Sequence, residues 1–193
     1  MDYSKNEDYF ADYGCCLLFL SFIFRLKQLT DAQYDAAVRS ELQGMQQKAL
    51  DKLGIDIDEV KEIEPIIIDG YVYENSKFPL WYKKGEDGLW RTNVYKVVYL
   101  FFSQNEVHSY TCEYCTTQEQ KSESTDVYFY QDIVSASTES AVSTIGNEQI
   151  QYESFKLTTS GGTSLRAAVR DSELAQRSIS AMRQLLRAKK VSS

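Results

Sequence analysis

Apolar residues recur at every third or fourth position over residues 30–54, which is the period of an amphipathic helix. Thr30 and Gln33 form a capping-box pattern at its start, and Gly54 is a typical helix stop. The expected stripe is a packing face, with a partner-binding face as the alternative. Its members are Tyr34, Val38, Leu42, Met45, Ala49 and Leu53.

The apolar period shortens to two after a second, short helix. Asp56 and Glu59 form another capping-box pattern, which predicts a helix over residues 56–63 that ends before Pro65. From there apolar and polar residues alternate, as in strands with one buried face. Strands are expected over residues 66–74, 80–84, 89–102, 107–115, 125–137 (kinked near Gln131 and Asp132), 151–159 and 163–169, and polar loops over 116–124 and 138–147.

A second helical stripe closes the sequence over residues 171–190, through Ala175, Ile179, Met182 and Leu186. A barrel or sandwich of strands leaves an open end that such a helix can cover. We therefore expect an α+β fold in which a C-terminal helix caps about seven antiparallel strands. The expected division is an N-terminal helical segment, residues 1–63, and a β domain, residues 64–193.

The order of these elements resembles the bacterial pleckstrin-homology-like (PH-like or GRAM-like) domain. The resemblance lies in the runs LFFSQNEVHSY, VYFYQDIVSAS, FKLTTSGGTSLRAAV and ELAQRSISAMRQLLRAKK, which lead through a "(Y/F)-x-D-I" strand to a closing helix. It covers residues 64–190. Residues 30–63 are more loosely similar to the front of uncharacterised bacterial proteins that carry such a domain. The resemblance implies a PH-like barrel or sandwich and no particular reaction, because its motifs are structural.

Residues 15–24, CCLLFLSFIF, are the most apolar run of the chain. Even a run of roughly 16 residues makes a helix of only ~24 Å, against the ~30 Å hydrocarbon core of a membrane. Acidic residues precede the run, which argues against a secretory signal peptide. We expect residues 13–27 to pack as a buried helix. The alternative is an anchor at the inner face of a membrane, followed by Arg25 and Lys27 on the cytoplasmic side.

The charge and cysteine content narrow the function classes. A formal net charge of −7 argues against an extended nucleic-acid surface, which must be basic. Four cysteines in 193 residues, two of them adjacent, do not resemble a secreted disulfide framework. Reduced thiols and a cytoplasmic location are therefore expected.

The metal-like pattern of the chain is His108-x3-Cys112-x2-Cys115. Structural zinc sites use four ligands, and only three lie close together here. Residues three apart on a strand also point to opposite faces, so we expect ordinary strand cysteines rather than a zinc site. The single histidine and the absence of a G-x-S-x-G elbow and of a phosphate-binding glycine loop argue against an enzyme or a cofactor.

Many PH-like domains bind phosphoinositides through basic residues of the first hairpin, and the resemblance implies the same surface here. Glu86 and Asp87 lie in that turn and would repel a headgroup, so a solvated hairpin is expected. A lipid or partner contact is the alternative. The residues concerned are Lys77, Lys83, Lys84 and Arg91.

These observations predict a non-enzymatic intracellular binding or scaffold protein. Its partner would be another protein or a second copy of the chain, with no cofactor and no nucleic acid. The alternative is a peripheral membrane protein held at a membrane surface through residues 13–27. A zinc-binding protein using His108, Cys112 and Cys115 is the third hypothesis.

Overall fold

The computed structural model describes residues 29–191, and the chain divides into two compact units at Ser40/Glu41. The described part of the first unit contains helix α2 (Asp31–Ser40). The predicted capping box at its start is confirmed. The Thr30 amide donates to Gln33 Oε1 at 3.0 Å, and the Gln33 amide donates to Thr30 Oγ1 at 3.2 Å. The apolar segment 13–27 lies outside the described residues.

The prediction of one continuous helix over residues 30–54 is wrong, because the chain forms two. Helix α2 ends at Ser40, and α3 runs from Met45 to Leu53. Gly44 between them has a φ of 71°, a left-handed conformation that a right-handed helix cannot contain. The predicted stop at Gly54 is confirmed by its φ of 67°.

The short helix expected over residues 56–63 is a single 3₁₀ turn, η1 (Ile57–Glu59). The Asp56 side chain caps it by accepting from the Asp58 amide at 3.1 Å. The turn stops there because the following residues pair with a strand. Lys61 forms a bridge with Phe102, and the Glu62 amide donates to the Phe102 carbonyl at 3.3 Å.

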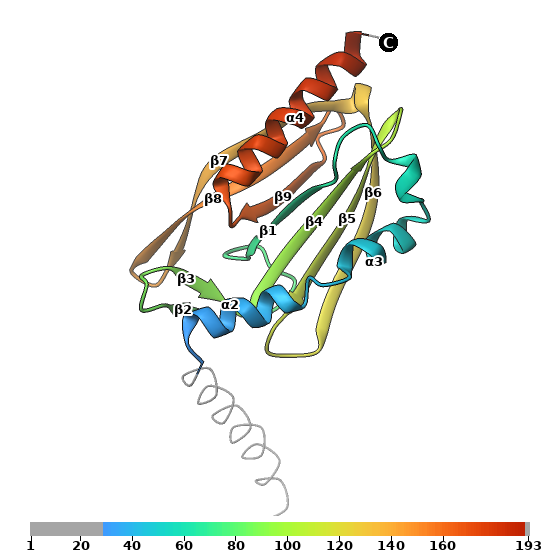
Figure 1. Cartoon of the computed structure of the whole chain (residues 1–193). Helices are drawn as coiled ribbons and strands as arrows, with labels where there is room; N and C mark the ends of the chain where they lie inside the picture. Colours follow the sequence, from blue (N-terminus) through green and yellow to red (C-terminus); the bar gives the residue numbers. More distant parts are fainter. Residues whose placement is uncertain (1–28, 192–193) are drawn as a thin grey trace, which may run out of the picture. The chain divides into compact units, whose positions relative to one another are not determined.

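Over residues 29–191, nine strands form three antiparallel sheets, followed by one long helix (Figure 1). The first sheet has the order β1 (Ile66–Tyr71), β4 (Val94–Phe102), β5 (Glu106–Cys115), β6 (Gln120–Phe129). The second has the order β7 (Ile133–Ile145), β8 (Glu148–Thr159), β9 (Ser164–Val169). Strands β2 (Tyr82–Lys84) and β3 (Trp90–Thr92) form a separate hairpin, and α4 spans Ser172–Val191.

The α+β class with a C-terminal helix is as predicted, but the count of seven strands is not confirmed. Two expected strands are each divided in two. Asn93 interrupts the third, because its side chain binds the Trp81 amide and the Pro79 carbonyl. The 3₁₀ turn η2 (Tyr130–Asp132) interrupts the fifth at the predicted kink. The sheets do not close into a barrel, since β6 and β7 are both end strands.

The two polar loops expected over residues 116–124 and 138–147 are largely strand. Strand β6 already begins at Gln120, and β7 continues to Ile145. Both are end strands with mostly solvated side chains, so their composition resembles that of loops. Their strand conformation comes from backbone pairing with β5 and β8.

The central strands of the first sheet, β4 and β5, are buried on both faces. Residues 97–102 of β4 are all buried. One face joins the second sheet and α4 in the main core, where the four predicted stripe residues of α4 are buried. On the opposite face Lys48 and Lys52 of α3 pair with Glu123 of β6.

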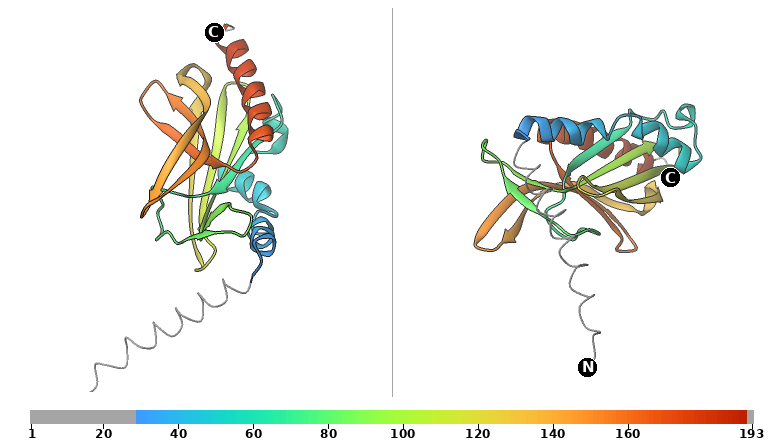
Figure 2. Two further views of the ribbon diagram at one scale, coloured as in Figure 1. Left: turned by 90° about the vertical axis from the view of Figure 1, so that its left-hand side faces the viewer. Right: turned by 90° about the horizontal axis from the view of Figure 1, so that it is seen from below.

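The two sheets are inclined to each other and meet where β9 passes β1 (Figure 2). The Arg170 amide donates to the Asp69 carbonyl there at 2.9 Å. Across residues 29–191 no helix is both long enough and apolar enough to cross a membrane.

Candidate functional site

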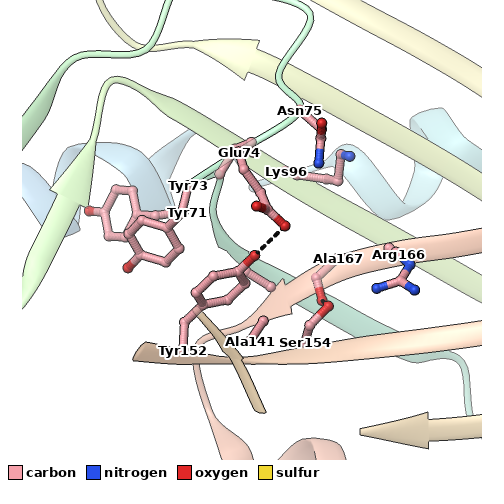
Figure 3. A pocket seen from close by; sticks show the side chains of 12 residues that line it. Tyr71, Tyr73, Glu74, Asn75, Lys96, Ala141, Tyr152, Ser154, Arg166 and Ala167 are labelled. Carbon is pink, nitrogen blue, oxygen red and sulfur yellow. Dashed lines mark hydrogen bonds between the residues drawn. The ribbon is translucent and has the colours of Figure 1, made fainter. Parts of the chain in front are cut away.

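A small cleft lies where the chain leaving β1 passes the sheet β7–β9 (Figure 3). Its volume is about 100 Å³. The lining residues come from five stretches of sequence. The first runs from the end of β1 into the segment after it, and the other four lie in strands β4, β7, β8 and β9. The polar and aromatic members of the lining are Tyr71, Tyr73, Glu74, Asn75, Lys96, Tyr152, Ser154 and Arg166.

One wall of the cleft is a tyrosine–carboxylate pair. The Tyr152 hydroxyl donates to Glu74 Oε1 at 3.0 Å (Figure 3). The Tyr152 ring also packs against Tyr73, with ring centroids 4.9 Å apart at an angle of 46°. Burial, and then the hydrogen bond to Glu74, raise the pKa of Tyr152 above its ordinary value. The phenol therefore stays protonated at neutral pH and acts as a fixed donor that orients the carboxylate.

Two cations complete the lining, and each has its own acidic partner. Lys96 lies with its Nζ 3.4 Å from Glu113 Oε2, and Arg166 pairs with Glu139. Glu113 is buried and also accepts from the Ser76 hydroxyl and the Lys77 amide, both at 2.8 Å. The cleft is therefore polar without a dominant sign of charge.

The cleft is small and its lining contains one serine. The serine in the lining is Ser154, whose hydroxyl points at backbone carbonyls and lies 3.4 Å from the Ala167 carbonyl oxygen. The lining contains no histidine and no cysteine. A nucleophile–base pair of the usual kind is thus missing from it. Pockets for drug-sized ligands measure about 300–1,000 Å³, so this cleft has room for one side chain or a small ion.

The structure places the metal-like residues on one strand, β5, but not on one face. His108 and Cys112 are four residues apart and share a face, whereas Cys115 lies on the other. The His108 Nε2 lies 3.3 Å from Glu106, and the Asn93 side-chain Nδ2 donates to Cys115 Sγ at 3.3 Å. Within the described range 29–191, no three histidine, cysteine or acidic side chains are grouped as metal ligands.

The four basic residues suggested by the first hairpin are held in different ways. Arg91 is buried and forms a bidentate pair with Asp87, at 2.8 and 3.0 Å. Lys84 lies over the Trp90 ring and 3.3 Å from Glu148. The remaining two are exposed. Lys83 lies opposite Arg91 across the hairpin, and Lys77 Nζ donates to Ser122 Oγ at 2.9 Å.

Sequence reasoning missed the cleft, because its residues are separated by up to 97 positions, from Tyr71 to Ala168, and follow no motif. One feature of the sequence could have pointed to the cleft, namely a charged residue in an apolar stripe. Lys96 lies in the same alternating stripe as Val94, Val98 and Leu100, where a charge requires a buried partner. The identity of that partner, Glu113, depends on the pairing of β4 with β5, in which the two residues are directly opposite.

Compared with protein-family models, with curated proteins and with solved structures, the chain gives no significant match.

Proposed function

We propose that the protein is a non-enzymatic binding or scaffold protein whose cleft receives one polar side chain of a protein partner. The observation that carries this proposal is the paired wall of the cleft. Glu74 is exposed and oriented by Tyr152, and Arg166 is half-exposed on the neighbouring strand. A volume of about 100 Å³ matches a side chain rather than a cofactor.

The order of the strands supports a PH-like architecture as part of this proposal. The hairpin β2–β3 is inserted between β1 and β4, which are neighbours in the first sheet. If this hairpin is set aside, the four strands of the first sheet are followed by the three strands of the second sheet and the closing helix, which is the order that the resemblance implies. A headgroup site on the hairpin has less support, because Arg91 and Lys84 already have acidic partners.

Selection from a displayed library of random peptides on the immobilised full-length chain tests the binding proposal. We expect a consensus with one charged or amide side chain. Glu74→Gln removes the charge of the cleft wall but keeps an acceptor for Tyr152. Arg166→Gln removes the half-exposed cation. At least one of these variants should weaken the selected peptides about tenfold or more, equivalent to about 1.4 kcal/mol.

The matched control is Glu119→Gln, the same type of change at an exposed position in the turn between β5 and β6. It should bind the selected peptides as the wild type does. Equal binding by all four proteins would place the peptide site elsewhere, and the absence of any consensus would contradict a peptide-binding function.

A reducing compartment is also part of the proposal, and it rests on the cysteine content of the sequence.

A further inference from the structure

The outer edge of β7 is covered by helix α4 over its first part only. As an end strand, β7 pairs with β8 on one side and presents its other backbone edge outward. Arg183 Nε of α4 donates to the Ala136 carbonyl at 2.7 Å, and Lys190 Nζ donates to the Ile133 carbonyl at 2.6 Å. These contacts satisfy the outward carbonyls where the strand begins.

Beyond Ala136 the edge is open. Backbone groups of alternate residues point to the same side of a strand. Because the Ala136 carbonyl points outward, the carbonyls of every second residue after it also point outward, namely Thr138, Ser140, Val142 and Thr144. Among the described residues, none donates a backbone or side-chain hydrogen bond to these four carbonyls. Residues 137–145 thus form an unpaired template for another strand.

The composition of this open segment does not oppose pairing. Natural end strands are usually protected by charges or proline. Strand β6, an end strand of the first sheet, carries Lys121, Glu123 and Asp126 within ten residues. Residues 137–145 of β7 carry a single charge, Glu139, with no proline and no glycine. Their small and β-branched side chains suit a strand pair.

We propose that a second copy of this chain pairs with this edge, strand β7 against strand β7 in antiparallel orientation, with the two-fold axis at Ala141. Ser140 then faces Val142 of the other copy, and Thr138 faces Thr144. Glu139 faces Ser143 rather than a like charge. All facing residues are small, β-branched or neutral except this one glutamate.

Registers with the axis nearer the start of β7 are less favourable for two reasons. An axis at Glu139 would place the two glutamates directly opposite each other, and facing like charges destabilise a strand pair. An axis at Ser140 would confine the pair to residues 137–143, because Thr144 would then face Ala136, whose carbonyl already accepts from Arg183. The axis at Ala141 uses the open segment 137–145 and stops before that contact.

Ala141 also lines the cleft, but the inference does not depend on which ligand the cleft binds. Sedimentation velocity on the full-length chain tests it. The wild type should shift from monomer to dimer as its concentration is raised to about 100 µM, the range of a weak interface. Val142→Lys places two charges in the paired edge and should weaken dimerisation at least tenfold. Val127→Lys is the matched control on the other end strand, because the two valines are 51% and 48% exposed.

Circular dichroism of all three proteins first establishes that they are folded. A wild type that stays monomeric, a dimer unaffected by Val142→Lys, or equal loss with Val127→Lys would each overturn the proposal.

A crosslink tests the register separately. With Cys15 and Cys16 replaced by serine, Ala141→Cys should form a disulfide-linked dimer under mild oxidation. Facing residues at a non-hydrogen-bonded position have Cα atoms about 4.5 Å apart, within the range of a disulfide. Thr144→Cys in the same background faces residue 138 and should crosslink at least tenfold more slowly. Crosslinking of the Ala141 variant no faster than this control would contradict the proposed axis.

Discussion

Gly70 of β1 lies against the backbone of Ala168 of β9. A β-carbon at Gly70 would come within 2.6 Å of the Ala168 carbonyl oxygen and 2.8 Å of its carbonyl carbon. The two sheets can therefore approach this closely only where β1 has no side chain. The adjacent hydrogen bond from the Arg170 amide to the Asp69 carbonyl, at 2.9 Å, shows how close the two strands are.

Gly70→Ala should lower the free energy of unfolding by about 1–3 kcal/mol, because the backbone of β9 must move away from β1. Urea denaturation followed by circular dichroism measures the change. Gly161→Ala is the matched control, since an added β-carbon there meets no atom within 4 Å and the backbone is not left-handed. Equal free energies of unfolding for the two variants would show that the close approach of β1 and β9 does not contribute to stability.

Glu113 should contribute more to stability than any exposed ion pair of the protein. It is buried and holds the Ser76 hydroxyl, the Lys77 amide and Lys96 together. Glu113→Ala would leave these groups without their acceptor and should cost about 3 kcal/mol. Ser76→Ala should cost about 1 kcal/mol. In a double-mutant cycle the two losses should not add, and strict additivity would argue against the shared hydrogen bond.

Glu123 should make the fold sensitive to acid. The hydrogen bonds from Lys48 and then Tyr110 lower its pKa from 4.5 to about 2. A lowered carboxyl pKa adds stability above the unfolded-state value, and that stability is lost as the pH falls from about 5 to about 2. Glu123→Gln should therefore cost roughly 1–2 kcal/mol at pH 6.

The difference in the free energy of unfolding between wild type and Glu123→Gln should shrink towards zero near pH 2. Urea denaturation between about pH 6 and pH 2 measures this difference. Glu119→Gln, which changes an exposed glutamate at the β5–β6 turn, should show no such dependence. A constant difference at every pH would mean that the Glu123 charge does not matter.

Cys112 should be inert in the native protein. It is fully buried, and burial raises the pKa of its thiol above the ordinary value. With Cys15 and Cys16 replaced by serine, Ellman's reagent at pH 8 should find no fast-reacting thiol before denaturation, because Cys115 is buried as well. Two thiols should react in guanidinium chloride. Rapid labelling of Cys112 in the native state would contradict the packing of β5 described above.

Local signals predicted much of the fold. The capping box at Thr30, the stop at Gly54 and the kink near Asp132 depend on a few neighbouring residues, and each is present in the structure. Gly44 was the exception. A glycine within an apolar stripe is compatible with a continuing helix, and its left-handed conformation was not evident from periodicity alone.

The strand ends were harder to predict, because pairing partners decide them. Lys121 and Glu123 belong to a stretch with the composition of a loop, but they lie opposite Tyr114 and Cys112 in a continuous ladder. No property of residues 116–124 considered alone distinguishes the part that pairs.

By itself the sequence determined the α+β class, the closing helix and the absence of a recognisable catalytic motif, because these depend on residue type and short-range period. The tertiary structure alone decided the cleft and the open edge of β7. Glu74 meets Tyr152, and β9 passes over Gly70, because two inclined sheets bring distant strands together. That geometry comes from sheet pairing and packing across the core, which no local pattern encodes.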